Sequence, residues 1–351
     1  MKIASLLKSV IISGCLTAVV FAPAAFAEVK LNGSGASFPF PIYSKWFKDF
    51  SKENKAARVD YQSKGSGAGI QDFLNEVVDF AASDAAMNDD EISKAKNGVV
   101  LLPMTAGEIV LTYNLKGVKE LKLPRAVYPE IFTGKITKWN DPKIVAANPG
   151  VKLPDESITV VVRSDSSGTS YVFSGHLSVI SEDFKSTVGQ EKSPQWPNSD
   201  KFVKAPKNDG VTATVKQTPG AIGYIEYGYA KLTKAPIAEL ENKEGKFVAA
   251  GPESGAAALA SAEFPADNLP GSDVPDLRAW IYDPAGESSY PIATFTWMLF
   301  PTKMGAEKAK IAHELIEYCL TKGQKIADSM GYIPLPKNVV EKNREVAQKI
   351  Q

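Results

Sequence analysis

The chain has 351 residues, with 40 Lys and Arg against 40 Asp and Glu, 44% hydrophobic residues and only two histidines. The apolar fraction is that of a globular protein, and the zero formal charge argues against a surface that binds nucleic acid or an acidic membrane. The two histidines leave little material for histidine-rich metal sites, and the length favours two lobes, because single cores rarely exceed about 250–300 residues.

The first 27 residues have the features of a cleaved secretory signal peptide. A basic start precedes an uncharged apolar stretch over residues 9–22, and Ala25-Phe26-Ala27 is a small-x-small cleavage site before Glu28. Residues 12–15 also loosely resemble a lipoprotein signal, in which Cys15 would carry the lipid. Cleavage after residue 27 leaves 324 residues with a formal charge of −2 and a single cysteine, Cys319, which helical spacing places in the core.

The mature N-terminal part alternates strand-like and helix-like stretches. Apolar and β-branched residues predict strands at residues 29–31, 59–62 and 78–82, separated by helices. Asn88, with Glu91 three residues later, is typical of a capped helix start. One helical face is predicted from the spacing of Ile42, Tyr43, Trp46, Phe47 and Phe50.

The rest of the chain continues this alternation. The second predicted helix carries Ile70, Phe73, Leu74 and Val77. Residues 231–276 show no sharp periodicity and receive no assignment. The pattern favours α/β layers with mostly parallel strands. Further strands are predicted at residues 107–115, 157–162, 221–225 and 290–300, with helices over 171–180 and most of the last 40 residues.

Three loops share one plan, in which a strand is followed by Gly and hydroxyl residues and then by a helix. They are residues 33–38, 65–69 and 166–169. A helix N-terminus offers unpaired N–H groups and a partial positive charge, and glycine lets an anion approach them. One such loop is commonplace, because Ser, Asp and Gly cap many helices. Three loops that converged at strand ends would form an anion site.

Two ionisable side chains lie at strand ends beside these loops. Arg163 precedes the third loop, and Asp165 could either hold its guanidinium or cap the next helix. Asp84 ends a predicted strand, where it could serve as a turn residue. Because a carboxylate only accepts hydrogen bonds, Asp84 would otherwise suit an anion that keeps one proton, which favours phosphate over sulfate.

Enzyme motifs are incomplete in this sequence. The Gly-Ser stretches do not fit G-x-S-x-G, and Phe38 and Ile70 occupy the third glycine position of G-x-G-x-x-G. The chain also lacks a Walker motif and Cys or His clusters for a metal. His176 and His313 both lie on helical stretches with apolar neighbours, so a Ser/His/Asp triad has little support.

Six segments in a fixed order carry a resemblance to a known family. They are GSGASFPFPIYSKW (33–46), YQSKGSGAGI (61–70), VDFAASDAAM (78–87), IFTGKITKWND (131–141), VVRSDSSGTSYVF (161–173) and TPGAIGYIEYGYA (218–230). Together they resemble the periplasmic phosphate-binding proteins of bacterial phosphate ABC importers. Residues 231–285 match that family only weakly.

The resemblance implies the type II periplasmic-binding-protein fold. This α/β fold has two lobes, each a central mixed sheet flanked by helices, joined by two crossover strands. Lobe I would comprise residues 28–112 and 286–351, and lobe II residues 113–285. The resemblance implies no cofactor and no metal, and it makes Asp165 the partner of Arg163. It assigns phosphate binding to Ser37, Phe38, Ser66, Asp84, Arg163, Ser167, Gly168 and Thr169.

The function implied by the resemblance is that of a non-enzymatic receptor. The protein would capture inorganic phosphate between its lobes in the periplasm and deliver it, as a monomer, to the membrane permease of an ABC transporter. Other classes stay open: a secreted phosphatase or an adhesin on the same scaffold, or a binder of sulfate or molybdate. The resemblance requires no charge at Lys64, and its role also stays open.

Overall fold

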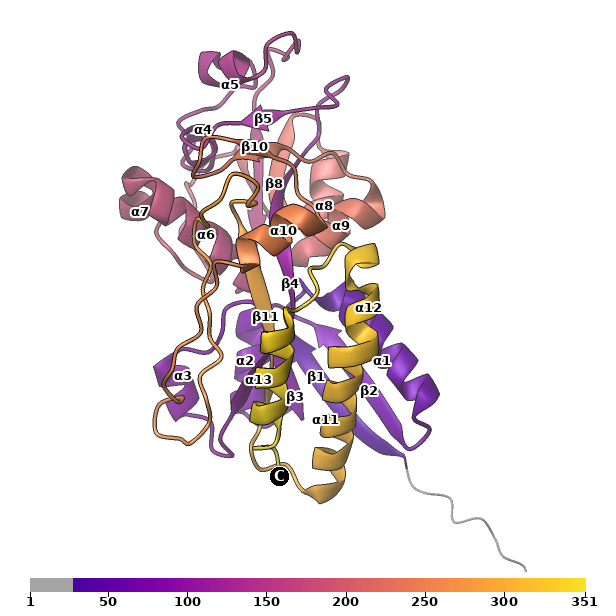
Figure 1. Ribbon diagram of the computed structural model, residues 1–351. Helices are drawn as coiled ribbons and strands as arrows, with labels where there is room; N and C mark the ends of the chain where they lie inside the picture. Colours follow the sequence, from indigo (N-terminus) through magenta and orange to yellow (C-terminus); the bar gives the residue numbers. More distant parts are fainter. Residues whose placement is uncertain (1–27) are drawn as a thin grey trace, which may run out of the picture.

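The computed structural model describes residues 28–351, and the first part of this range alternates strands and helices as predicted (Figure 1). The predicted signal peptide lies outside the described residues. The first strand continues through half of the predicted loop, because residues 33–35 pair with β3. Val77, which was predicted to lie on the second helix, follows the last residue of α2 and is exposed. The elements are β1 (Val29–Gly35), α1 (Phe40–Glu53), β2 (Ala57–Ser63), α2 (Ser66–Leu74), β3 (Phe80–Ser83) and α3 (Asp89–Ser93).

The middle of the chain repeats the strand–helix alternation. A long strand, β4, leads into this part, and its 14 residues are all buried. The predicted strands at residues 157–162 and 221–225 correspond to β6 and β8. The elements are β4 (Val100–Tyr113), β5 (Lys122–Leu123), α4 (Val127–Phe132), α5 (Pro142–Ala147), β6 (Thr159–Arg163), α6 (Gly168–Ile180), α7 (Glu182–Thr187), β7 (Phe202–Ala205), α8 (Lys207–Gln217), β8 (Ala221–Glu226) and α9 (Tyr227–Thr233).

The last part returns the chain to the starting lobe through β11. Residues 231–276, which received no assignment from the sequence, contain two short strands and a helix. The two strands form a three-stranded sheet with β5, and the helix packs beside β11. The C-terminal residues are largely helical, as predicted. The elements are β9 (Glu239–Glu241), β10 (Phe247–Val248), α10 (Pro252–Leu259), β11 (Ala293–Phe300), α11 (Ala306–Tyr318), α12 (Gln324–Ala327) and α13 (Lys337–Ala347).

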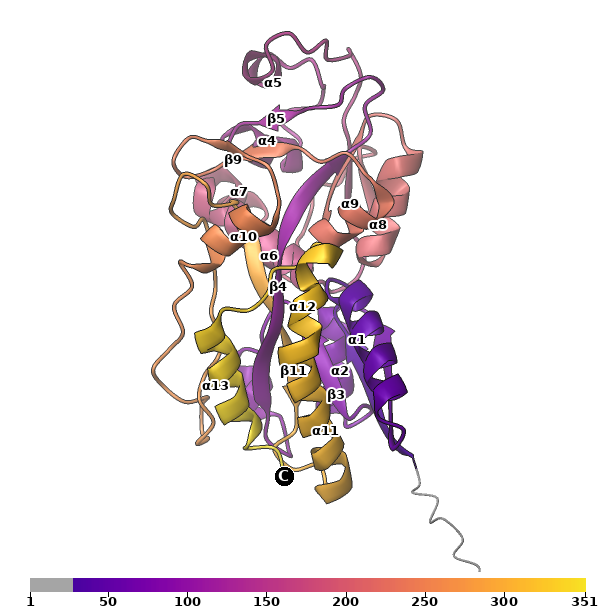
Figure 2. The same ribbon diagram turned by 45° about the vertical axis from the view of Figure 1, so that its right-hand side comes forward.

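One eight-stranded mixed sheet runs through both lobes, in the order β2-β1-β3-β11-β4-β8-β6-β7. The three strands at each end are parallel, as the alternation predicted, whereas the pairs β3–β11, β11–β4 and β4–β8 are antiparallel. β4 pairs with β11 over residues 100–108 and with β8 over residues 109–113. The strand therefore passes from one lobe into the other (Figure 2).

Helices cover the sheet in two lobes, one above the other in Figure 1. The lower lobe carries α1, α2, α11 and α13, and the upper lobe carries α4 and α6–α9. The predicted aromatic face of α1 is buried, and Trp46 Nε1 donates a hydrogen bond to the carbonyl oxygen of Gly323 (3.0 Å). Cys319 is buried, as its spacing predicted.

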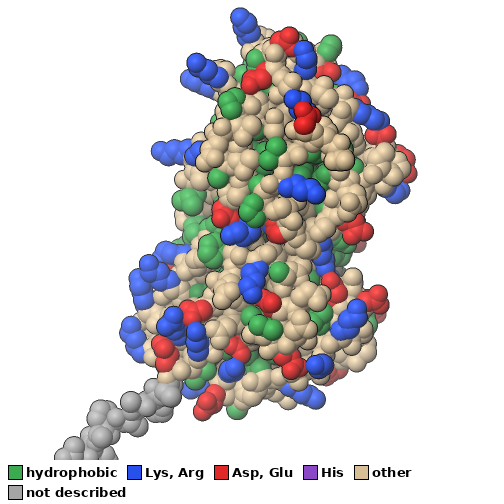
Figure 3. Space-filling model, turned by 180° about the vertical axis from the view of Figure 1, so that it is seen from behind, with side chains coloured by type: hydrophobic (Ala, Val, Ile, Leu, Met, Phe, Trp, Pro, Cys, Tyr) green, Lys and Arg blue, Asp and Glu red, His purple; other side chains and the backbone are tan. Residues whose placement is uncertain are grey.

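Basic and acidic side chains are interspersed on the face of the molecule shown in Figure 3. Within residues 28–351, no helix combines the length and the apolar character needed to span a bilayer.

Candidate functional site

The structure brings the three predicted loops together. The starts of α2 and α6 touch, since the N–H of Gly67 donates a hydrogen bond to the carbonyl oxygen of Ser166 (3.0 Å). A Cβ atom at Gly168 would lie 2.4 Å from Ser66 Oγ, so this approach requires glycine. All eight residues predicted to bind the anion are buried: Ser37, Phe38, Ser66, Asp84, Arg163, Ser167, Gly168 and Thr169.

Four backbone N–H groups in these loops have no acceptor among residues 28–351. Ser66 is the first residue of α2, and Gly168 and Thr169 are the first two of α6, so their N–H groups lack partners within the helix. The N–H of Phe38 likewise donates to no described residue. Two of the three segments are helix N-termini, which carry a partial positive charge. This arrangement of donors suits a small anion.

Asp84 lies at the end of β3 with 1% of its surface exposed. Its carboxylate accepts hydrogen bonds from Thr296 Oγ1 (3.0 Å) and Thr169 Oγ1 (3.4 Å), and its N–H donates to Ser66 Oγ (3.2 Å). Burial raises the pKa of Asp84 to about 7, although these hydrogen bonds and the charge of Arg163 oppose the rise. The carboxyl group can therefore gain or lose a proton near neutral pH.

Arg163 is held by Asp165 through two hydrogen bonds, from Nε to Oδ1 (2.9 Å) and from Nη2 to Oδ2 (2.6 Å). The third nitrogen, Nη1, donates to Thr169 Oγ1 (3.2 Å). Burial alone would raise the pKa of Asp165, but the guanidinium lowers it below its usual value. Ser167, rather than Asp165, caps α6. The pair fixes one cation beside the start of this helix.

Two further residues complete the polar network, and the sequence analysis missed both. Thr296 is in β11, a fully buried and mostly apolar strand, and its hydroxyl reaches Asp84. Asn208, at the start of α8, donates from Nδ2 to Ser37 Oγ (2.9 Å) and to Thr169 Oγ1 (3.2 Å). A hydroxyl inside a buried strand was an available signal for Thr296, whereas Asn208 follows a loop without the Gly and Ser pattern.

Lys64 has a local partner near the second loop. Its Nζ lies 2.8 Å from Asp72 Oδ2, and the same carboxylate oxygen accepts a hydrogen bond from Ser34 Oγ (2.6 Å). The lysine is exposed. Its charge pairs with α2 through Asp72, and the Ser34 hydroxyl joins β1 to the same carboxylate.

Ion pairs hold the two sides of the site together. Lys192 Nζ lies 2.6 Å from Glu91 Oε1 on α3, and both side chains are largely buried. Arg278 Nη1 donates to Asp89 Oδ1 (2.8 Å) and to the carbonyl oxygen of Met87 (3.0 Å). These contacts join α3 and Met87, just before it, to two later segments of the chain, around residues 192 and 278.

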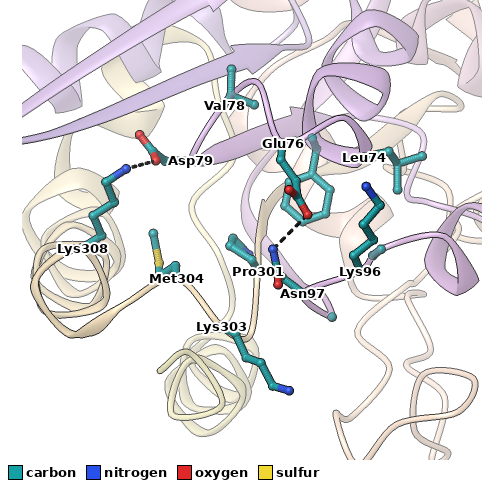
Figure 4. Close-up of a pocket in the computed structure, with 13 residues that line it drawn as sticks. Leu74, Glu76, Val78, Asp79, Lys96, Asn97, Pro301, Lys303, Met304 and Lys308 are labelled. Atoms are coloured by element: carbon teal, nitrogen blue, oxygen red, sulfur yellow. Dashed lines mark hydrogen bonds and ion pairs between the residues drawn. The ribbon is translucent and has the colours of Figure 1, made fainter.

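A surface hollow of about 260 Å³ lies elsewhere, and no predicted site residue lines it (Figure 4). Asp79 pairs with Lys308 there (2.6 Å), and Asn97 donates a hydrogen bond to Glu76 (3.1 Å). Its charged groups are partly neutralised by one another. The hollow is therefore a weaker candidate for an anion site than the polar network around Asp84 and Arg163.

The fold and the site define a class of protein. Residues 22–322 match the PBP superfamily domain, so the chain belongs to that superfamily. The solved structures agree on the fold. A high-affinity periplasmic phosphate-binding protein bound with phosphate, PfluDING, has a TM-score of 0.72 at 21% identity and covers 90% of this chain and 93% of its own. A phosphate-binding protein from Stenotrophomonas maltophilia has a TM-score of 0.69 at 22% identity and covers 91% and 94%.

The particular family is shown by curated relatives. The phosphate-binding protein PstS of Xylella fastidiosa strain Temecula1 is 37% identical, with 90% of this chain and 84% of the relative covered. That of Haemophilus influenzae is also 37% identical, with 90% and 92% covered. The phosphate-binding protein PstS of Methanocaldococcus jannaschii is 36% identical, with 90% of this chain and 85% of the relative covered. The chain belongs to the PstS family of phosphate-binding proteins.

Proposed function

We propose that this protein captures one inorganic phosphate between its lobes and delivers it to the membrane permease of an ABC importer. It acts in the periplasm, as a monomer and without catalysis. The observation that carries the proposal is the buried Asp84 beside Arg163 and the unpaired N–H groups at the starts of α2 and α6. The names and bound phosphate of the relatives support the same ligand.

Several groups of the site donate hydrogen bonds to phosphate, and one group accepts a hydrogen bond from it. Arg163, the backbone N–H groups and the hydroxyls of Ser37, Ser66 and Thr169 donate hydrogen bonds to phosphate oxygens. Asp84 accepts the proton that phosphate keeps at neutral pH and that sulfate lacks. Because these groups are buried and fixed, their dipoles act with little screening by salt. The site is therefore selective for a protonated tetrahedral oxyanion.

We also propose the lobe boundaries that the resemblance implies: residues 28–112 with 286–351, and residues 113–285. Support comes from β4, which changes partner from β11 to β8 after residue 108. The cleft between these lobes opens to admit phosphate and closes around it.

A phosphatase on this scaffold would need a base beside a nucleophilic hydroxyl. The two histidines make contacts elsewhere: His176 Nε2 lies 2.8 Å from the Tyr128 hydroxyl, and His313 Nε2 lies 3.0 Å from the carbonyl oxygen of Ile350. The buried position of His176 lowers its pKa to about 3, so it stays neutral. These positions favour a receptor over an enzyme.

The test is a calorimetric titration of the mature, phosphate-stripped protein, starting at Glu28, with phosphate, sulfate and molybdate. We expect one phosphate per chain and no response to the other two anions. A parallel assay with a chromogenic phosphate ester should give no turnover. Binding of sulfate with equal affinity, or release of phosphate from the ester, would refute the proposal.

A further inference from the structure

Asn208 is a fully buried amide that contacts two of the three hydroxyls proposed to donate to phosphate, those of Ser37 and Thr169. Its backbone N–H and its Nδ2 both donate to Ser37 Oγ, at 3.1 and 2.9 Å. Nδ2 also donates to Thr169 Oγ1 at 3.2 Å. One side chain thus joins the loop after β1 to the start of α6.

The orientation of this amide is fixed by its own oxygen. Asn208 Oδ1 accepts a hydrogen bond from the N–H of Glu226 (2.8 Å), so the oxygen and nitrogen cannot exchange places without losing it. The preceding residue, Lys207, has a φ of 59°, and its N–H donates to Asp165 Oδ1 (2.8 Å). Such a conformation is costly for a non-glycine residue and persists where its surroundings hold it.

These hydrogen bonds fill the acceptor sites of the Ser37 and Thr169 hydroxyls, so each hydroxyl can only donate to a further group. A hydroxyl has two acceptor sites and one proton to donate. Ser37 Oγ uses both acceptor sites on Asn208. Thr169 Oγ1 uses its own on Arg163 Nη1 and Asn208 Nδ2. Both hydroxyls can then act toward any further group only as donors, and Thr169 directs its proton to the Asp84 side of the site.

We propose that Asn208 is a positioning residue that leaves Ser37 and Thr169 only a proton to offer, so that Ser37 donates to the bound oxyanion and Thr169 turns its proton to that oxyanion from Asp84 Oδ2, its 3.4 Å acceptor in the unliganded site. It touches no phosphate oxygen itself. Through it, the site requires unprotonated oxygens opposite these two hydroxyls and leaves the ligand's single proton for Asp84. This inference rests on the proposed function and adds the residue that sets the direction of the hydrogen bonds.

The test compares phosphate affinity across a set of variants. Asn208→Asp keeps the shape but replaces two donors by acceptors, so both hydroxyls turn toward the new carboxylate. Loss of two hydrogen bonds to an anion should weaken binding about 100-fold or more. Asn208→Ala frees the hydroxyls to rotate and should weaken binding about 10-fold. Thr212→Val is the matched control, because the Thr212 hydroxyl donates to the backbone carbonyl oxygen of Asn208 (2.8 Å) and, among residues 28–351, to no hydroxyl of the site, so it should change affinity less than about twofold.

A mutant cycle separates positioning from a merely structural role. In a Ser37→Ala, Thr169→Val background the hydroxyls are absent, so Asn208→Ala should weaken binding by less than about twofold. The unfolding midpoints of all the unliganded variants show which of them fold. If Asn208→Ala does not fold, Asn208→Asp takes its place in the comparison. Two results would overturn the inference about Asn208 without touching the proposed function. One is a loss of phosphate affinity from Asn208→Ala that is as large in that background as in the unmodified protein, and the other is an unchanged phosphate affinity of Asn208→Asp. Failure of the unmodified protein to bind phosphate would refute the proposed function and the inference together.

Discussion

Replacing Asp84 by asparagine tests the proton-accepting role with almost no change of shape. Burial raises the pKa of this carboxyl group from its ordinary value of 3.8 to about 7. At roughly 1.4 kcal/mol per pH unit, ionised Asp84 costs the closed, unliganded protein about 4 kcal/mol above pH 7. That figure is an upper limit, because opening of the lobes rehydrates the carboxylate.

The pH dependence of stability has a definite sign. Between pH 4 and 7 the folded protein holds a proton on Asp84 that the unfolded chain has lost, so stability falls as the pH rises through this range. Above pH 7 the full cost is present. Asp84→Asn removes it, and the unliganded variant should gain stability over the unmodified protein as the pH rises from 5 to 8.5. Glu108, whose pKa burial raises to about 8, contributes equally to both proteins.

Anion selectivity should change in the same variant. An amide can donate a hydrogen bond to a fully deprotonated oxygen, and it removes one negative charge from beside the anion. At pH 8 both anions carry about two negative charges, so this charge effect largely cancels in the ratio, and what remains is the hydrogen bond from the phosphate proton to the carboxylate, worth about 1.5–3 kcal/mol. The ratio of phosphate to sulfate affinity should therefore fall by about 10- to 100-fold. Calorimetric competition at pH 8 measures this ratio. An unchanged ratio, together with an unchanged pH dependence of stability, would refute the role given to Asp84.

Three other variants probe the rest of the site. Arg163→Ala should weaken phosphate binding by about 2–5 kcal/mol in calorimetry, whereas the same change at the exposed, ion-paired Arg344 should cost less than about 1 kcal/mol; equal losses would contradict a direct role. Gly168→Ala should hold the lobes apart and abolish tight binding while the unfolding midpoint changes little, and an unaltered titration would show that the helix starts need not touch. Lys207→Gly should keep the free energy of unfolding within about 1 kcal/mol of that of the unmodified protein, because glycine tolerates a φ of 59°. Lys207→Val should lower it by about 1–3 kcal/mol. Similar free energies for the two variants in denaturant titrations would argue against local strain.

Much of the local structure could be predicted from short-range pattern. The capping box of Asn88 and Glu91 is confirmed at the start of α3, with both reciprocal hydrogen bonds present. The aromatic face of α1 is confirmed as buried. Both predictions depend only on residues within two or three helical turns. The general rule that parallel strands bring their carboxyl ends to one edge of a sheet accounts for the loops after β1 and β2, whereas the third loop follows β6, which runs antiparallel to them and belongs to the other parallel set.

The missed features depend on contacts between distant segments. Thr296 and Asp84 are 212 residues apart in the sequence, and no local pattern links them. Asn208 acquires its role from Ser37 and Thr169, which lie on other elements. β9, in the stretch that received no assignment, is a strand because residues 239–240 pair with β5, more than 100 positions earlier. Periodicity within a window carries no information on such pairings.

The position of β11 between β3 and β4 sets an order of events during synthesis. The chain emerges N-terminus first, so β3 and β4 are present long before residues 293–300, which must fit between them. Until then each of these two strands presents a free edge that other chains can pair with. The starting lobe cannot finish folding until nearly the whole polypeptide has arrived. A chaperone that keeps the chain extended through residue 300 would therefore protect it from such pairing.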